Sequence, residues 1–164
     1  MATGRKVVRT AFYDRIEADD TFFQYFGDFS DEEIQAIADT RANTYIAEAV
    51  AILKRRCEVE IDFSIDEEND TFIDDLTAEE ILLIGGDLAF EVYIGREIAK
   101  MKTRINTFSS SDLRALHSPA SERKSFMDMY RELKADNEVK ILDYASRDRT
   151  TGRYISVNKG GGIV

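Results

Sequence analysis

The chain has 164 residues, of which 43% are hydrophobic and 33% charged, and its formal net charge is −10. A single cysteine, Cys57, and a single histidine, His117, exclude an internal disulfide and most zinc sites, which need three or four Cys, His or carboxylate ligands. No apolar run approaches the ~18 residues of a membrane-spanning helix, and the basic residues 1–10 lack the apolar stretch of a secretory signal, so we expect a soluble globular protein made in a reducing compartment.

Aromatic residues crowd the segment that precedes the first clear helical pattern. Because so dense a cluster has to be buried, we expect it to pack beneath the following helix or against a partner. The aromatic residues of this cluster are Phe22, Phe23, Tyr25, Phe26 and Phe29.

The first clear helix is expected to begin after Ser30, where Glu33 occupies the position that completes a capping box. Apolar residues then recur at helical spacing, and basic residues occupy the final turn, where cations suit the helix dipole. The helix is expected to run to about Cys57, either continuously or with a break at residues 41–43. Cys57 itself is expected to be a small buried hydrophobic residue.

The middle of the chain changes to a period of two. Val59, Ile61, Phe63 and Ile65 alternate with polar residues, which predicts a short extended strand with one buried face. The acidic segment that follows, residues 66–75, begins like a calcium loop. It lacks the glycine at the sixth position and the glutamate at the twelfth, so we do not expect calcium binding.

A second, longer helix is expected to begin after Thr77, with Glu80 completing another capping box, and to reach about Thr107. Such a helix would be ~45 Å long. Three glycines lie within it, each about 1 kcal/mol less favourable than alanine, which predicts close packing by a neighbouring helix or a kink. They are Gly85, Gly86 and Gly95.

The third helix is expected to begin at Ser118-Pro119 and to end near Asn137. Beyond it, residues 139–144 and 154–157 are expected to form two short strands joined by a polar turn, followed by a glycine-rich flexible tail. We therefore predict a mainly α fold: a helical bundle domain with a long central helix (1–137), and a C-terminal β-hairpin arm with its tail (138–164).

Residues typical of catalysis do not gather in a recognisable pattern. A nucleophilic pair of Cys57 and His117 would lack the third group that such a site needs. The carboxylate pairs Asp74-Asp75 and Glu79-Glu80 are more typical of a helix start than of acid–base chemistry. We expect no enzymatic activity, no cofactor and no metal site.

Charge is divided unevenly along the chain. Residues 1–80 carry 8 Lys/Arg and 21 Asp/Glu, a net charge of −13, whereas residues 81–164 carry 14 Lys/Arg and 11 Asp/Glu, a net charge of +3. The acidic half would repel phosphates, which argues against tight DNA binding. The division either favours head-to-tail contacts between copies or partners, or reflects two solvated halves.

Residues 72–154 also carry a series of short motifs in a characteristic order. They are Asp75-Leu76-Thr77, Glu80-Ile81-Leu82, Ser111-Asp112-Leu113, Ser118-Pro119-Ala120, and a helix bearing Phe126, Met129 and Leu133. In this order the chain resembles the small structural proteins of tailed bacteriophages that form the neck, the head–tail connector or adaptor rings beneath the portal.

The resemblance implies a helical subunit with an extended arm, assembled into a closed ring, often a dodecamer, through which DNA passes without specific binding. The implied partners are copies of the same chain, the portal protein and other neck or tail proteins, with no membrane. The implied location is the virion neck, after synthesis in the host cytoplasm. On this hypothesis the arm residues Arg147, Arg149, Arg153 and Tyr154 contact neighbouring subunits, with arginine forks on carboxylates.

A function of a different class is also compatible with the composition. An acidic regulatory or inhibitory protein that mimics nucleic acid would occupy a basic groove of a host protein. That role needs carboxylates regularly spaced on one exposed face, whereas here they concentrate in residues 66–80.

Overall fold

The computed structural model describes residues 2–17, 20–23, 27–57, 61–107 and 119–155. In this part of the chain the fold is mainly α, as predicted, with one two-stranded sheet. In chain order the elements are α1 (Arg5–Arg15), the 3-10 turn η1 (Asp20–Phe23), α2 (Asp31–Arg56), β1 (Ile65–Asp66), β2 (Thr71–Phe72), α3 (Ala78–Ile81), the π-helical segment η2 (Leu82–Leu88), α4 (Ala89–Thr107) and α5 (Pro119–Ala145).

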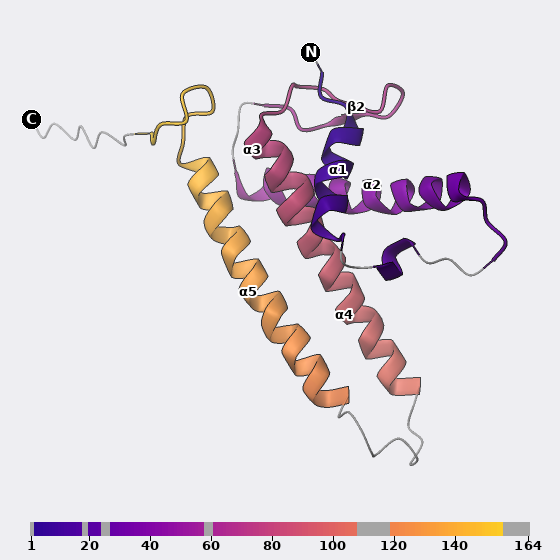
Figure 1. Ribbon diagram of the computed structural model, residues 1–164. Helices are drawn as coiled ribbons and strands as arrows, with labels where there is room; N and C mark the ends of the chain where they lie inside the picture. The colour runs from indigo at the N-terminus through magenta and orange to yellow at the C-terminus, as the bar shows by residue number, and fades with distance from the viewer. Residues whose placement is uncertain (1, 18–19, 24–26, 58–60, 108–118, 156–164) are drawn as a thin grey trace, which may run out of the picture.

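The helices form a body with a long protruding pair. Helices α1 and α2 cross near the start of the α3–η2–α4 helix, and α4 and α5 run side by side away from them (Figure 1). The apolar core lies where α1 and α2 pack on η2 and the start of α4, and Ile141 and Tyr144 in the C-terminal half of α5 belong to it. This arrangement leaves both the β1–β2 turn and the segment after α5 on the surface.

Helix α2 begins and ends as its sequence predicts. The Ser30 hydroxyl accepts from the Glu33 N–H, and the Glu33 carboxylate accepts from the Ser30 N–H at 2.9 Å. The helix is continuous through residues 41–43, which settles the alternative of a break there, and it ends at Cys57, whose side chain is buried in the core. Its buried face consists of Ala38, Ala42, Tyr45, Ile46, Ala49, Val50 and Leu53.

The long central helix is formed by α3, η2 and α4 in succession, and its predicted capping box at Thr77 and Glu80 is present. Of the two predicted explanations for its glycines, close packing is found at Gly85 and Gly95, whereas a Cβ atom on Gly86 would meet its nearest neighbour only at 3.8 Å. A Cβ atom on Gly85 would lie 2.4 Å from the Val8 carbonyl oxygen of α1, and one on Gly95 would lie 3.2 Å from the Tyr130 hydroxyl of α5. At Gly85 and Gly95 the absence of a side chain therefore lets atoms of α1 and α5 pack close to this helix.

Helix α1 was not anticipated from the sequence. Its buried residues Val8 and Phe12, followed by Ile16, recur every four positions and enter the core. The expected burial of the aromatic cluster is confirmed for Phe22, whose ring packs edge-on against Phe12 with centroids 5.6 Å apart. Phe29 is exposed, and Tyr25 and Phe26 lie outside the described residues.

Of the described residues of the predicted extended segment in the middle of the chain, only Ile65 lies in a strand, because β1 spans Ile65–Asp66. Strand β1 pairs antiparallel with β2, with Ile65 opposite Phe72, and Gly4 forms a bridge to Thr71 on the other side of β2. Phe63 and Phe72 are fully buried beneath this sheet. Residues 58–60, at the start of the predicted strand, lie outside the described residues.

The predicted end of the third helix near Asn137 is wrong, because α5 continues to Ala145. Residues 139–144, predicted as the first strand of the hairpin, are helical. The physical reason is that Asn137, Ile141 and Tyr144 follow one another at helical spacing and are all buried against the body. The predicted domain boundary at 137/138 thus falls inside a helix. Ser118 and residues 156–164 lie outside the described residues.

Candidate functional site

The segment after α5, residues 146–155, is a tight turn that we call the arm. The Asp148 N–H donates to the Arg153 carbonyl at 2.7 Å, and the Ile155 N–H donates to the Ser146 carbonyl at 2.8 Å. Gly152 has a φ of +65°, which permits the reversal of the chain. Within the described residues, the predicted hairpin is reduced to one isolated β-bridge, between Arg147 and Tyr154.

The arm is fastened to the body by a buried carboxylate. Glu80 is fully buried at the start of α3, where its capping role places it. Arg149 donates to it from Nε at 2.6 Å and from Nη2 at 2.9 Å, which is the two-pronged geometry that guanidinium and carboxylate groups favour. The Tyr144 hydroxyl donates to the same carboxylate at 2.5 Å, and the Thr77 N–H donates at 2.7 Å. Every side of this carboxylate is therefore occupied by a donor.

This surrounding also determines the protonation of the group. Burial raises the pKa of Glu80, but hydrogen bonds from Arg149, Tyr144 and the Thr77 N–H outweigh it, so that its pKa lies below the usual range. Burial and the adjacent carboxylate raise the pKa of Tyr144 well above the usual range. At neutral pH the anchor is therefore an ionised carboxylate that holds a guanidinium and a neutral phenol.

The other predicted contact residues divide into two groups. Arg147 forms an ion pair with Asp143 and lies over the Tyr154 ring at 5.1 Å, and the Tyr154 hydroxyl donates to Asp143 at 2.7 Å. The Tyr154 hydroxyl and, after it, Arg147 lower the pKa of Asp143. Arg153 is exposed. The structure thus uses three of the four residues in contacts within the chain, and only Arg153 extends without such a side-chain contact among the described residues.

A polar hollow of about 620 Å³ opens beside the arm. Its lining combines carboxylates, guanidinium groups and aliphatic side chains, and lacks an arrangement of nucleophile and base. The lining residues are Ile61, Asp74, Asp75, Tyr144, Ala145, Arg147, Asp148, Arg149, Thr150 and Ile155.

Neither metal-binding nor nucleophilic chemistry finds support in the described part of the chain. No group of three or more His, Cys, Asp or Glu side chains is placed there to hold a metal ion. Burial raises the pKa of the Cys57 thiol, which keeps it protonated and a poor nucleophile. His117 lies outside the described residues.

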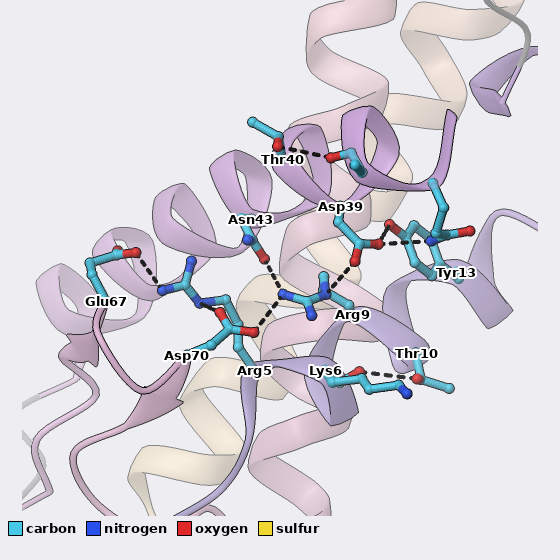
Figure 2. Close-up of polar contacts among 12 residues, drawn as sticks. Arg5, Lys6, Arg9, Thr10, Tyr13, Asp39, Thr40, Asn43, Glu67 and Asp70 are labelled. Carbon is cyan, nitrogen blue, oxygen red and sulfur yellow. Dashed lines mark hydrogen bonds and ion pairs between the residues drawn. The ribbon is translucent and has the colours of Figure 1, made fainter. Parts of the chain in front are cut away.

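A second polar network, which sequence analysis did not single out, joins α1 to the β1–β2 turn and to α2 (Figure 2). Arg5 pairs with Glu67 at 2.7 Å and with Asp70 at 3.0 Å. Arg9 pairs with Asp70 at 3.1 Å and donates to the Asn43 side chain at 3.0 Å. Two carboxylates of the acidic segment, Glu67 and Asp70, are thus paired with arginines of the same chain.

Aliphatic side chains are also exposed at several places on the helices. Examples are Val7 on α1, Leu82 on η2, Val139 and Leu142 on α5, and Ile155 in the arm. The outward positions of Val139 and Leu142 lie opposite the buried face of α5. Single exposed aliphatic side chains are common on protein surfaces, so these positions by themselves identify no interface.

Among the described helices, none is long and apolar enough to cross a membrane. Comparisons of the chain with family models, with curated proteins and with solved structures found no match.

Proposed function

We propose that this chain is a structural subunit that works by docking onto other protein chains, and that it forms a ring in the neck of a tailed phage, between portal and tail. The ring lets DNA pass without binding it specifically. The order of motifs in residues 72–154, which resembles that of neck proteins, suggests the family. Chemistry on a substrate is not part of this proposal.

The observation that carries the proposal is the arm. Its base is fixed by Arg149 on the buried Glu80, while Tyr154 and Ile155 beyond it are 66% and 58% exposed. An anchored loop loses little further entropy when its exposed side chains bind a partner, because its base is already ordered. Such a preorganised, partly apolar projection suits contact with another subunit better than it suits solvent.

The acidic charge supports the same proposal. A ring with the net charge of −10 on each subunit would repel the phosphates of DNA passing through it, so that the DNA would slide without adhering. The neck role therefore needs no DNA-binding surface.

The alternative role as a mimic of nucleic acid has less support, because some carboxylates near and within the acidic segment already pair with basic side chains of the same chain. Asp70 forms ion pairs with Arg5 and Arg9, and Asp62 forms an ion pair with Lys54. A mimic would instead present its carboxylates free on one face.

The test is the size of the assembly. Light scattering after chromatography, and negative-stain images with and without the portal protein of the same phage, should show a ring or a complex with the portal. Ile155→Asp should weaken that assembly, whereas Thr150→Asp, at an exposed polar position in the same arm, should not. A strict monomer that ignores the portal would contradict the proposal.

A further inference from the structure

The outward face of α1 carries two opposite charges at its two ends. Lys6, Val7, Thr10, Ala11 and Asp14 fall within about 140° of the helix circumference, and the first and last are separated by about 12 Å along its axis. Lys6 and Asp14 are exposed, and neither forms an ion pair with another described residue. Figure 2 shows Lys6 and Thr10 on the side of α1 away from the arginine network.

Beside this face, Leu82 projects from η2 between two hollows. The first hollow, of about 430 Å³, is lined by Leu82 and by Lys6, Val7, Thr10, Ala11 and Asp14 of α1. The second, of about 360 Å³, lies between Leu82 and α5 and includes Ala78, Leu83 and Tyr144. Leu82 is 60% exposed and Val7 is 50% exposed. The same surface therefore holds both aliphatic projections and the hollows that could receive them.

We propose that this face is a twofold contact with a second copy of this chain, in which α1 packs antiparallel against α1 of the partner. A twofold axis near Thr10 would bring Lys6 opposite the partner subunit's Asp14, and Asp14 opposite the partner subunit's Lys6. Leu82 of each copy would enter a hollow of the other. Self-complementarity of this kind is what an isologous interface requires, because the same patch must serve both sides.

The charge pattern favours this occupant over an unrelated protein. A face with a cation at one end and an anion at the other is complementary to itself when one copy is turned end over end. A parallel arrangement would instead place like charges together. The proposal goes beyond the neck function, because a twofold contact cannot by itself close a ring; it joins two subunits or two rings.

The contact is small, since it involves one short helix and the start of another. Interfaces at the low end of the size range belong to weak complexes, so the dissociation constant is expected to be micromolar. Sedimentation velocity across a concentration series measures it directly.

The test uses charge reversal and its rescue. Lys6→Glu and Asp14→Lys should each raise the dimer dissociation constant about tenfold or more, because each turns two attractive pairs into repulsive ones. An equimolar mixture of the two variants should dimerise again, since both of its pairs are attractive. The double variant K6E/D14K should also recover dimerisation on its own. Rescue on mixing shows in addition that each single variant is folded.

Matched controls reverse exposed charges elsewhere on the surface. Lys124→Glu and Glu132→Lys on α5 make the same changes in net charge and should leave the dissociation constant unchanged. Leu82→Glu, at an exposed position, should abolish the dimer even when the charges are intact.

Two outcomes would overturn the inference: a wild-type chain that stays monomeric to millimolar concentration, or a dimer that the single reversals weaken but neither the mixture nor the double variant restores. Loss of the dimer with portal binding intact would leave the neck function standing. Dimerisation without any ring or portal complex would support the twofold contact and contradict the neck function.

Discussion

Two surface loops are tied to the helical body by arginine–carboxylate contacts, but the buried member has opposite sign in the two places. At the β1–β2 turn the buried groups are Arg5 and Arg9 of α1, with side chains 5% and 11% exposed, and the loop supplies the carboxylates. At the arm the buried group is Glu80, 0% exposed, and the loop supplies Arg149, 37% exposed.

The difference teaches how each anchor fails. A buried guanidinium keeps its charge at every accessible pH, so the network at α1 depends on the loop carboxylates around it. A buried carboxylate can become neutral by binding a proton. In acid, Glu80 can therefore lose its buried charge, and with it the ion pair to Arg149. The network at α1 shares its charges among several partners, whereas the buried Glu80 is paired with one arginine of the arm, Arg149.

The largest expected effect comes from leaving the buried carboxylate without its cation. Arg149→Leu should lower the free energy of unfolding by about 3 kcal/mol, because Glu80 would remain charged and buried. Urea denaturation followed by circular dichroism measures the change. Arg153→Leu, in the same arm but exposed, should change stability by less than about 0.5 kcal/mol. Equal effects of the two substitutions would show that the anchor contributes no stability.

The packing of α1 against the central helix can be disrupted by a substitution that changes no charge. Gly85→Ala should cost about 2 kcal/mol, because its Cβ would lie 2.4 Å from the Val8 carbonyl oxygen and α1 would have to shift. Gly86→Ala is the matched control, since its Cβ would meet the Ala11 carbonyl oxygen at an ordinary 3.8 Å. In thermal unfolding, the midpoint temperature of Gly86→Ala should equal or exceed that of the wild type, and that of Gly85→Ala should be lower.

The sharing of charge in the network at α1 is tested at Asp70. Asp70→Asn keeps a residue that tolerates the φ of 52° but removes the charge that contacts Arg5 and Arg9, and should cost about 1.5 kcal/mol. Glu67→Gln removes only an exposed carboxylate and should cost less than about 0.5 kcal/mol. If urea titrations gave the larger cost at Glu67, the ranking of these contacts would be wrong.

The smallest effect is the response of the arm anchor to acid. The pKa of Glu80 is lowered in the folded chain from an ordinary value of 4.5, so its ionised form stabilises the fold above pH 4.5 and loses that contribution as the pH falls toward the folded pKa. The stability difference between wild type and Glu80→Gln, about 1 kcal/mol at pH 7, should therefore stay constant down to about pH 5.5 and shrink below 4.5. A difference that grew in acid would contradict this assignment.

The predicted contact residues illustrate what local sequence can and cannot reveal. The basic and aromatic composition of residues 147–154 drew attention to the arm. It could not show that Arg149 pairs with Glu80, because the two are 69 positions apart. As contacts to other subunits, Arg147, Arg149, Arg153 and Tyr154 stay predictions, and the exposed Arg153 has the most freedom for that role.

By itself the sequence determined the mainly α class and the starts of α2 and of the central helix, and it left close packing or a kink open at the glycines. The helix starts and the fold class depend on capping residues and periodicity, which act within a few positions. Only the tertiary structure decided that residues 139–144 are helical, because burial of Ile141 and Tyr144 against the body outweighs their apolar, strand-like composition. It also decided which carboxylate receives the arm, since that choice depends on where α3 and α5 meet in space.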